Sequence, residues 1–501
     1  MANSTYRKMK KRSPVCEHDG LDVVTALTEA FRGGNVHANR LYVSELHDFT
    51  AFDKSAHYVN IMIHERFPIT PFQKEGYTTN DELEYMIAKR DYECLFRLKI
   101  RNLKLKNPLE PVPYISKSKC RNIIGCGPMR EINKKGEIRY IQDPRIGEID
   151  NGRLCYCMYF EATFLSLDFE IVKRQYDFDY EIVDLWTSEL GYLPPEFRRY
   201  LVHCYRTKTM YKNVKGKETE YNLAKIDGNA CYGLFVQSFI TDSYEFDEYT
   251  GEVSTICNSD LSYYDKKYMY EEACQKRPTP YRLGVACACL ARYELQEGID
   301  VMGADWAYGD TDSTFGIGDF TAEFEELNKK YIERALKSGA YATDPDGVVH
   351  YCGSWELDKE GDIVTMGSKK YAVKKKDGTV VITVAGCPKG PCSLELQEAG
   401  GLSAFKEGMV FHGGKLRPIY NMEVPDEEFE LYDYRGNTGK VKLRPNVCLV
   451  DTEYKLSYGD EYGKLIKAIK SGDEQALDDL LASTELDATK YSYYLHKLHG
   501  C

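Results

Sequence analysis

A short acidic segment, residues 308–313 (YGDTDS), places the tightest constraint on how this chain can fold. Apolar residues flank it and Gly309 permits a tight turn, so the pattern predicts a hairpin of two short strands over residues 304–318. Extended backbone would put Asp310 and Asp312 on one face. Paired carboxylates at such a turn suit Mg²⁺, which takes further ligands from substrate phosphates. A solvated surface hairpin has the same spacing, whereas the downstream ligands of an EF-hand are missing.

A second segment, residues 225–233 (KIDGNACYG), carries three functional side chains on one predicted helix face. Lys225, Asn229 and Tyr232 recur at i, i+4 and i+7, which is the spacing of a single face. The lysine could meet a phosphate, and the tyrosine ring could lie against a base or sugar. Five more cations precede the segment: Arg206, Lys208, Lys212, Lys215 and Lys217. A solvated amphipathic helix that packs through its tyrosine would fit the same pattern.

The overall charge limits the kind of partner that the chain can bind. The 501 residues contain 66 Lys and Arg against 78 Asp and Glu, which gives a net charge of −12. Because a protein that merely coats nucleic acid is usually basic, any nucleic-acid site here must depend on local clusters of basic residues.

The apolar runs are too short for a bilayer, and the basic N-terminus precedes no apolar stretch, so no membrane segment or signal peptide is expected. The 17 cysteines form no C-x-x-C array, which favours reduced thiols in a cytosol-like compartment.

The remaining pattern predicts an α+β fold with a central sheet and several appended modules. Periodicity predicts helices over residues 194–209, 219–235 and 283–298, a helix from 59 that stops at 67–68, and two amphipathic helices around 471–473. Strand and turn signals fall over residues 40–53, over 70–195 as short strands, and over 350–400.

A third segment, residues 53–58 (DKSAHY), lies at the junction of a predicted strand and helix. Taken together, the three segments resemble the family B DNA polymerases, and most closely the protein-primed subgroup of phages, adenoviruses and linear plasmids. The first motif of this subgroup has an aspartate followed five positions later by a tyrosine, which Asp53 and Tyr58 match. Its helix motif K-x-x-x-N-x-x-Y-G matches residues 225–233, and its Y-x-D-T-D-S motif matches residues 308–313, in the same order along the chain.

The first motif also departs from the subgroup pattern. Ala56, His57 and Val59 replace residues that are usual in relatives, which affects the expected sugar pocket more than the reaction class. Asp48 stands in a D-F-T triplet that could be mistaken for the motif aspartate. Its offset to Tyr58 does not fit, so Asp53 is the preferred candidate.

Weaker matches extend the resemblance to roughly residues 30–400. Residues 31–34 (FRGG) resemble the Y-x-G-G element that joins exonuclease and polymerase domains, with Phe31 in place of tyrosine. Residues 369–371 (KKY) resemble the K-x-Y motif near the primer terminus, and residues 150–153 (DNGR) resemble an insertion of the subgroup. The last hundred residues agree only in position and helical character.

The resemblance implies a right-hand polymerase, with an antiparallel palm sheet, helical fingers, a small thumb and two insertions typical of the subgroup. The implied divisions are an N-terminal segment with the first part of the palm (1–74), a first insertion (75–190), the fingers helices (191–237), a second insertion (238–280), the palm with the catalytic hairpin (281–398), and the thumb with C-terminal helices (399–501). The insertions could close around DNA, or they could be ordinary surface subdomains.

The resemblance also implies a set of metal ligands. Asp53 and Asp312 would hold two Mg²⁺ ions, for which Mn²⁺ can substitute. Asp310 would act as a supporting catalytic ligand, and the carbonyl oxygen of Lys54 would complete the metal shell. Such a site would add deoxynucleotides to a primer 3′-hydroxyl under the direction of a template.

Substrate contacts follow from the same resemblance. Nucleotide binding would fall to Tyr58, Lys212, Lys225, Asn229 and Tyr232, with Tyr58 stacked on the sugar so that a 2′-hydroxyl is excluded. DNA binding would fall to Gly33, Gly34, Thr311, Lys369 and Tyr371. The expected partners are primer-template DNA and dNTPs.

Relatives carry a 3′–5′ exonuclease domain before the Y-x-G-G element, whereas only about 30 residues precede it here, too few for that domain. A separate exonuclease subunit and a terminal priming protein are therefore possible further partners, in a bacterial host cytoplasm if the chain is phage-encoded. Two other functions stay open. A catalytically inactive nucleic-acid scaffold would have no need of Asp53, Asp312 and Lys225, and a metal-dependent phosphohydrolase would leave the Lys225 face unexplained.

Overall fold

The computed structural model describes most of the chain. The described residues are 14–39, 42–107, 110–125, 130–132, 138–140, 148–150, 152–240, 243–246, 253–256, 261–277, 279–412, 416–421, 428–432, 438–442, 446–451 and 453–457. The amphipathic helices expected around residues 471–473 lie outside this set. Within it, no helix is both long and apolar enough to cross a bilayer.

The first of two large sheets is antiparallel and carries the predicted catalytic hairpin. Its seven strands run in the order β1-β14-β15-β2-β18-β19-β20. Their bounds are Val36–Ala38 (β1), Trp306–Asp310 (β14), Ser313–Ile317 (β15), Leu46–Lys54 (β2), Trp355–Gly367 (β18), Lys370–Lys375 (β19) and Val380–Val384 (β20). The predicted hairpin is confirmed as β14 and β15. Within residues 40–53 a short strand followed by a polar turn was expected. The order is wrong: Ser44 adopts a left-handed φ of 65°, which interrupts extended backbone, and the strand Leu46–Lys54 follows it.

The helices beside this sheet largely follow the sequence prediction. α6 (Pro195–Met210) and α7 (Glu218–Phe235) differ from the predicted bounds by no more than one residue. α3 (His57–His64) follows β2 directly and ends before Phe67, as expected. The sequence analysis did not anticipate α10 (Thr321–Ser338), although its buried residues Phe324, Tyr331 and Ala335 recur at helical spacing.

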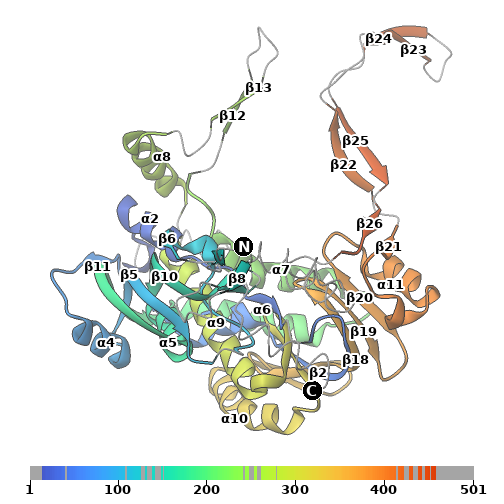
Figure 1. The fold of residues 1–501 in the computed structure, drawn as a ribbon. Helices are drawn as coiled ribbons and strands as arrows, with labels where there is room; N and C mark the ends of the chain where they lie inside the picture. The colour runs from blue at the N-terminus through green and yellow to red at the C-terminus, as the bar shows by residue number, and fades with distance from the viewer. Residues whose placement is uncertain are drawn as a thin grey trace.

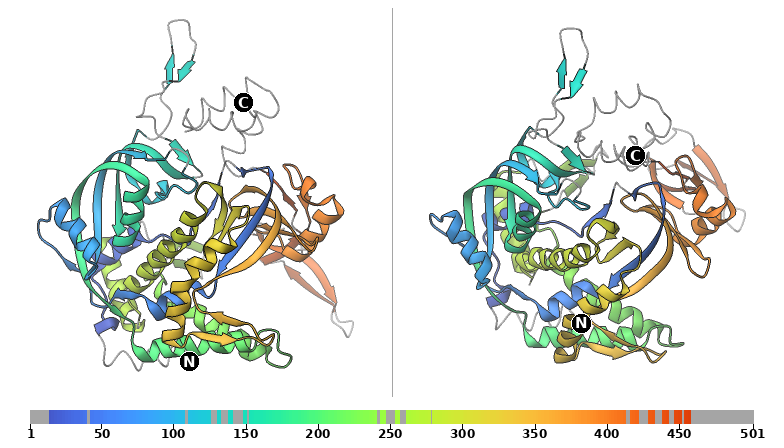
Figure 2. Two further views of the ribbon diagram at one scale, coloured as in Figure 1. Left: turned by 90° about the horizontal axis from the view of Figure 1, so that it is seen from below. Right: turned by 60° about the horizontal axis from the view of Figure 1, so that its bottom comes forward.

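Helix α9 (Tyr281–Met302) runs through the middle of the molecule, between the two large sheets (Figures 1 and 2). Two glycines let it approach its neighbours closely. A Cβ atom on Gly284 would lie 2.8 Å from the backbone of Phe235, and one on Gly298 would lie 2.9 Å from the ring of Trp355. The small residues seen in the sequence therefore allow α7 and the first sheet to pack directly on α9.

The second large sheet is also antiparallel and was only partly anticipated. Its strands run β3-β11-β5-β10-β6, with β4 on β11 and β9 on β10. The bounds are Arg66–Pro68 (β3), Tyr176–Tyr192 (β11), Tyr92–Leu105 (β5), Arg153–Leu165 (β10), Arg121–Ile124 (β6), Gln73–Lys74 (β4) and Glu148–Asp150 (β9). The expectation of short strands was wrong for β5, β10 and β11, which have 14, 13 and 17 residues. Polar residues alternate along part of β11 because one of its faces is exposed.

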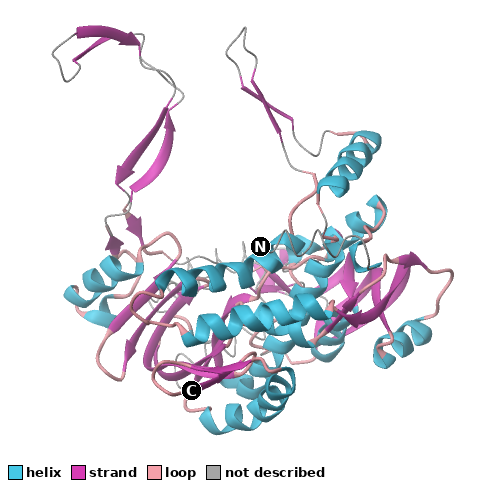
Figure 3. Ribbon diagram, turned by 180° about the vertical axis from the view of Figure 1, so that it is seen from behind, coloured by secondary structure: helices cyan, strands magenta, loops and turns pink. Residues whose placement is uncertain are grey.

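Three further helices accompany the second sheet: α2 (Leu21–Ala30), α4 (Asn80–Lys89) and α5 (Ser166–Gln175). Figure 3 shows helices gathered between the strands of the two sheets. Two slender hairpins project from the same side of the body, one formed by β12 and β13 next to α8, the other by β22 to β25 (Figure 1). The bounds of the remaining elements are Arg130–Ile132 (β7), Ile138–Tyr140 (β8), Ser243–Phe246 (β12), Val253–Ile256 (β13), Tyr263–Lys276 (α8), Tyr341–Thr343 (β16), Val349–Tyr351 (β17), Lys389–Glu398 (α11), Val410–Phe411 (β21), Leu416–Asn421 (β22), Glu428–Tyr432 (β23), Thr438–Lys442 (β24), Asn446–Asp451 (β25) and Tyr454–Lys455 (β26).

Candidate active site

The register of the first sheet brings Asp53 and Asp312 together. Asp53 pairs with Ser313 across β2 and β15, and the backbone N–H of Lys54 donates to the carbonyl oxygen of Asp312 at 2.8 Å. Both aspartates are half-buried. The alternative Asp48 lies toward the other end of β2, where its carbonyl oxygen accepts from Gly318. Of the two candidate aspartates, only Asp53 therefore stands beside the turn of the hairpin.

The electrostatics of this pair favour a bound cation. Burial and, to a lesser degree, the negative charge of Asp312 together raise the pKa of Asp53 to about 7. Burial and the charge of Asp310 raise the pKa of Asp312 to about 6. Two half-buried carboxylates that resist ionisation are stabilised in their charged form by a nearby cation. Among the described residues, no group of three or more His, Cys, Asp or Glu side chains is arranged to hold a metal ion by itself. The two carboxylates offer hard oxygen donors, the kind that Mg²⁺ takes together with phosphate oxygens and water.

Asp310 is engaged by a lysine. Lys369 Nζ lies 2.7 Å and 3.0 Å from its two carboxylate oxygens, and the Thr311 hydroxyl donates to it at 3.0 Å. Three residues around the site adopt left-handed backbone, with φ of 64° at Thr311, 56° at Lys369 and 51° at Ala56. Non-glycine residues rarely adopt this conformation, and such strain tends to cluster at functional sites.

The segment after α2 supports the hairpin from the side. A Cβ atom on Gly34 would lie 2.5 Å from the Thr311 hydroxyl, whereas one on Gly33 would meet nothing within 4 Å. Next to Gly34, the carbonyl oxygen of Asn35 accepts from the Thr311 N–H at 2.8 Å, and the Asn35 side chain accepts from Arg153. The FRGG element is thus packed on the turn between Asp310 and Asp312, and Asn35 is a contact that the sequence analysis missed.

Tyr58 and Tyr232 form a stacked pair beside the carboxylates. Their ring centroids lie 4.1 Å apart at an interplanar angle of 18°. α7 approaches α3 through Gly228, where a Cβ atom would lie 3.3 Å from Val59. Burial raises the pKa of Tyr58 to about 12, so its hydroxyl stays protonated at neutral pH. Tyr58 and Tyr232, which belong to separate sequence motifs, are therefore in direct ring contact in the structure.

The predicted cation Lys225 lies on α7, and Lys212 follows the end of α6. Lys225 and Asn229 are exposed on the face of α7 that also carries Gly228 and Tyr232, the residues that meet α3. Lys212 is exposed after the end of α6. Lys208, which the sequence analysis counted only as general positive charge, lies close enough to lower the pKa of Asp312.

Tyr371 lies beneath the hairpin. It is buried, with its ring centroid 4.7 Å from that of Tyr308 and 5.3 Å from that of Phe315. Tyr308 in turn accepts from the backbone N–H of Lys369 at 3.2 Å. In this structure, Tyr371 and Lys369 therefore support the β14–β15 hairpin directly.

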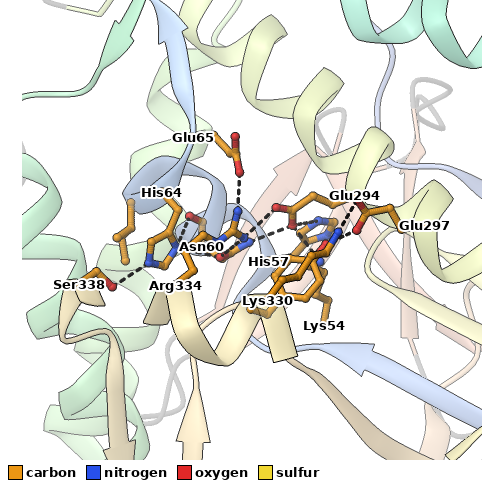
Figure 4. Close-up of polar contacts among 12 residues, drawn as sticks. Lys54, His57, Asn60, His64, Glu65, Glu294, Glu297, Lys330, Arg334 and Ser338 are labelled. Carbon is orange, nitrogen blue, oxygen red and sulfur yellow. Dashed lines mark hydrogen bonds and ion pairs between the residues drawn. The ribbon is translucent and has the colours of Figure 1, made fainter. Parts of the chain in front are cut away.

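The side chain of Lys54 points into the core, at the end of β2 that carries Asp53 (Figure 4). Its Nζ atom lies 2.9 Å from Glu294 of α9, 3.5 Å from the ring centroid of Tyr331 and 4.8 Å from that of Trp355. Glu294 also pairs with Arg334 of α10 at 2.8 Å. Burial lowers the pKa of Lys54 to about 8, while Lys54 and Arg334 outweigh burial and lower the pKa of Glu294 to about 2.

Glu356 is a second residue that sequence reasoning missed. It is the direct cross-strand neighbour of Asp53 on β18, and its charge contributes to raising the pKa of Asp53. Its carboxylate bonds to His350 Nδ1 at 2.9 Å. In the sequence it is one of several alternating carboxylates after Trp355, and only the strand pairing distinguishes it.

Comparison with known proteins finds similar folds among solved structures. Neither a protein-family model nor a curated protein matches the chain. Among solved structures, phi29 DNA polymerase in a ternary complex with primer-template DNA and incoming nucleotide matches with a TM-score of 0.52 and 16% identity, over 87% of this chain and 63% of that one. Phi29 DNA polymerase with single-stranded DNA matches with a TM-score of 0.56 and 17% identity, over 91% and 67%. This chain thus has a mixed α/β fold similar to that of phi29 DNA polymerase and spans about two thirds of its length.

Proposed function

We propose that the chain is a template-directed DNA polymerase that adds deoxynucleotides to a primer 3′-hydroxyl. The observation that carries the proposal is the pairing of β2 with β15, which puts Asp53 next to Ser313 and bonds Lys54 to Asp312. Within a fold similar to a DNA polymerase, this pairing joins two of the motif segments that the sequence resemblance singles out.

Asp53 and Asp312 would hold two Mg²⁺ ions, with the carbonyl oxygen of Lys54 as a further ligand and Mn²⁺ able to substitute. When bound, such ions lower the pKa of an attacking hydroxyl and neutralise the charge of a triphosphate. Asp310 has a supporting role, because Lys369 already neutralises it. Glu356 would add negative charge to the ligand set from the neighbouring strand.

The cations and aromatic rings would bind the incoming nucleotide. Lys208 adds positive charge near Asp312, and Lys225 and Lys212 would meet the triphosphate from α7 and the end of α6. Tyr58 would lie against the sugar. Because its ring stacks on Tyr232, it cannot easily retreat from a 2′-hydroxyl, and this would select deoxynucleotides by steric exclusion.

The rest of the proposal assigns larger parts of the chain. The first sheet would be the palm, α6 and α7 the fingers, and the segment after residue 399 the thumb. The second sheet and the β12–β13 hairpin with α8 would be the two insertions that hold primer-template DNA. Protein priming in a phage or mobile element, a bacterial cytoplasm, a terminal protein and a separate exonuclease subunit belong to the same proposal.

The test is extension of a labelled DNA primer by the purified chain, with Mg²⁺ and with a chelator. We expect Mg²⁺-dependent extension with dNTPs, and a fall of at least about 10³-fold for Asp53→Asn. Asp48→Asn is the matched control, since it removes a carboxylate from the same strand away from the hairpin turn. DNA binding without extension by the wild type would replace the proposal with the inactive scaffold. Equal loss in both variants would remove the special role of Asp53.

A further inference from the structure

The face of α6 that points away from the catalytic carboxylates lines a cationic groove. The groove has a volume of about 620 Å³ and lies between α6 and residues near the ends of α3 and α10, Ile63 and Ser338. Its basic side chains are Arg198, Arg199, His203 and Arg206, and no Asp or Glu among the described residues lines it. In a protein with a net charge of −12, a groove lined only by basic ionisable side chains marks a local site for anions.

The helix period separates this groove from the catalytic side of α6. Arg199, His203 and Arg206 recur at i, i+4 and i+7 and therefore share one face. The opposite face buries Phe197, Leu201 and Tyr205. Lys208, which acts on Asp312, lies on that opposite face. One helix thus presents positive charge in two opposite directions, and the nucleotide site uses only one of them.

Most of these cations lack a carboxylate partner among the residues that the structure describes. Arg199 pairs with Glu196 at 3.2 Å, but this pair is exposed. The Arg198 Nε donates to the carbonyl oxygen of Ile63 at 2.7 Å, and its guanidinium lies 4.8 Å from the ring centroid of Tyr192. Arg206 and His203 are exposed, and no ion pair within the described part of the chain engages them. The side-chain donors of Arg206 and His203 are therefore free for a ligand.

We infer that this groove binds the phosphodiester backbone of a nucleic-acid strand, outside the catalytic site. Guanidinium groups pair with phosphate oxygens in a bidentate manner. Arg199 and Arg206 are seven residues apart, which corresponds to roughly 10 Å of helix, enough for about three charges of a stacked strand at 3.4 Å each. Tyr211 in the groove and Tyr192 beside Arg198 offer rings on which bases can stack, which an acidic peptide would not need.

The test is the salt dependence of binding to a fluorescent single-stranded 20-mer, followed by anisotropy. The slope of log K against log salt is negative, and each lost phosphate contact makes it less steep by about 0.7. Arg199→Ala/Arg206→Ala should therefore make the slope less steep by about 1.4. A fourfold rise in salt then weakens the wild type about sevenfold more than the variant. The charge-matched control is Lys329→Ala/Lys330→Ala on α10, where both lysines are exposed and neither lines the groove. This control should keep the wild-type slope.

An unchanged slope in the arginine variant, or an equal fall in the α10 control, would overturn the inference. Displacement of groove-bound DNA by polyglutamate at lower charge concentration than by unlabelled DNA would also overturn it, in favour of an acidic protein. The result is separable from the proposed function. A wild type with no primer extension but a groove-dependent slope would refute the polymerase proposal and support the groove. Normal extension on a short template overhang by the arginine variant is expected, because neither arginine faces the catalytic site.

Discussion

The buried ion pair of Lys54 and Glu294 makes a sharp prediction about stability. The Lys54 side chain is fully buried, and its pKa falls from 10.5 to about 8. That fall corresponds to about 3 kcal/mol in favour of the neutral form. Burial thus opposes the charge of Lys54 even with Glu294 at 2.9 Å, whereas Lys54 and Arg334 favour the charge of Glu294, so the two effects act against each other. The pair is held in place by the fold around it and adds little net stability of its own.

Removing either partner should have very different consequences. Glu294→Gln leaves Lys54 buried without its counter-charge and weakens the hold on Arg334, so we expect unfolding free energy to fall by about 3–5 kcal/mol. Lys54→Met places an apolar chain of similar length between Tyr331 and Trp355, while Arg334 still neutralises Glu294. We expect that change to cost less than about 2 kcal/mol. Adding Lys54→Met to Glu294→Gln should then recover at least about 2 kcal/mol.

Urea unfolding followed by tryptophan fluorescence measures this coupling, because Trp355 lies beside the Lys54 ammonium. The matched control is Asp19→Asn, which breaks the fully buried Arg282–Asp19 pair toward the other end of α9. That variant should be additive with Lys54→Met, since the two sites share no partner. Additive losses for Lys54→Met and Glu294→Gln as well would refute the claim that they form one charge-balanced unit.

Three further predictions follow from individual contacts. Gly34→Ala should lower primer extension by about 100-fold, because its Cβ atom displaces Thr311. Gly33→Ala is the control, since its Cβ atom would enter open space and leave extension unchanged. Equal extension rates of the two variants would show that contact between Gly34 and Thr311 does not matter. Tyr58→Val should weaken discrimination against ribonucleotides by at least about tenfold, measured by competing rNTP and dNTP incorporation, and unchanged discrimination would remove its contact with the sugar. His57 is fully buried and burial lowers its pKa from 6.5 to about 3, so the unfolded chain takes up the proton first and stability falls as pH drops from 6.5 toward 3. His57→Phe should remove up to about 5 kcal/mol of that loss in acid-unfolding titrations, and an unchanged acid midpoint would argue against it.

Local sequence signals predicted the elements that form within a short stretch of chain. The glycine turn and its apolar flanks predicted the β14–β15 hairpin, and helical periodicity predicted α6 and α7 almost to the residue. The long strands of the second sheet were underestimated, because exposed charged residues along β5 and β11 interrupt the apolar pattern. Their length depends on pairing with each other, which a local pattern does not show.

From the sequence, members of the candidate site could be proposed only where the residue type itself, or its place in a family motif, suggests a function. Asp310 and Asp312 were proposed because paired carboxylates at a tight turn suit a metal ion, whereas Asp53 was singled out only by its place in a motif of the family that the chain resembles. The resemblance gave Lys54 a role through its carbonyl oxygen and implied nothing about its side chain, which the structure buries against Glu294. Its partners come from α9, α10 and β18, far along the chain, so no local pattern could reveal them. Glu356 likewise acquires its place only from the register with β2.

In the proposed polymerase, Asp53 and Asp312 share one pair of cations for nucleotidyl transfer. The most direct test of this sharing is single-turnover extension of a labelled primer-template by the wild type and by Asp312→Asn, with DNA affinity measured on the same samples. We predict that the variant binds primer-template with wild-type affinity and yet extends it at least about 10³-fold more slowly. Extension by Asp312→Asn at the wild-type rate would mean that Asp312 holds no cation needed for nucleotidyl transfer.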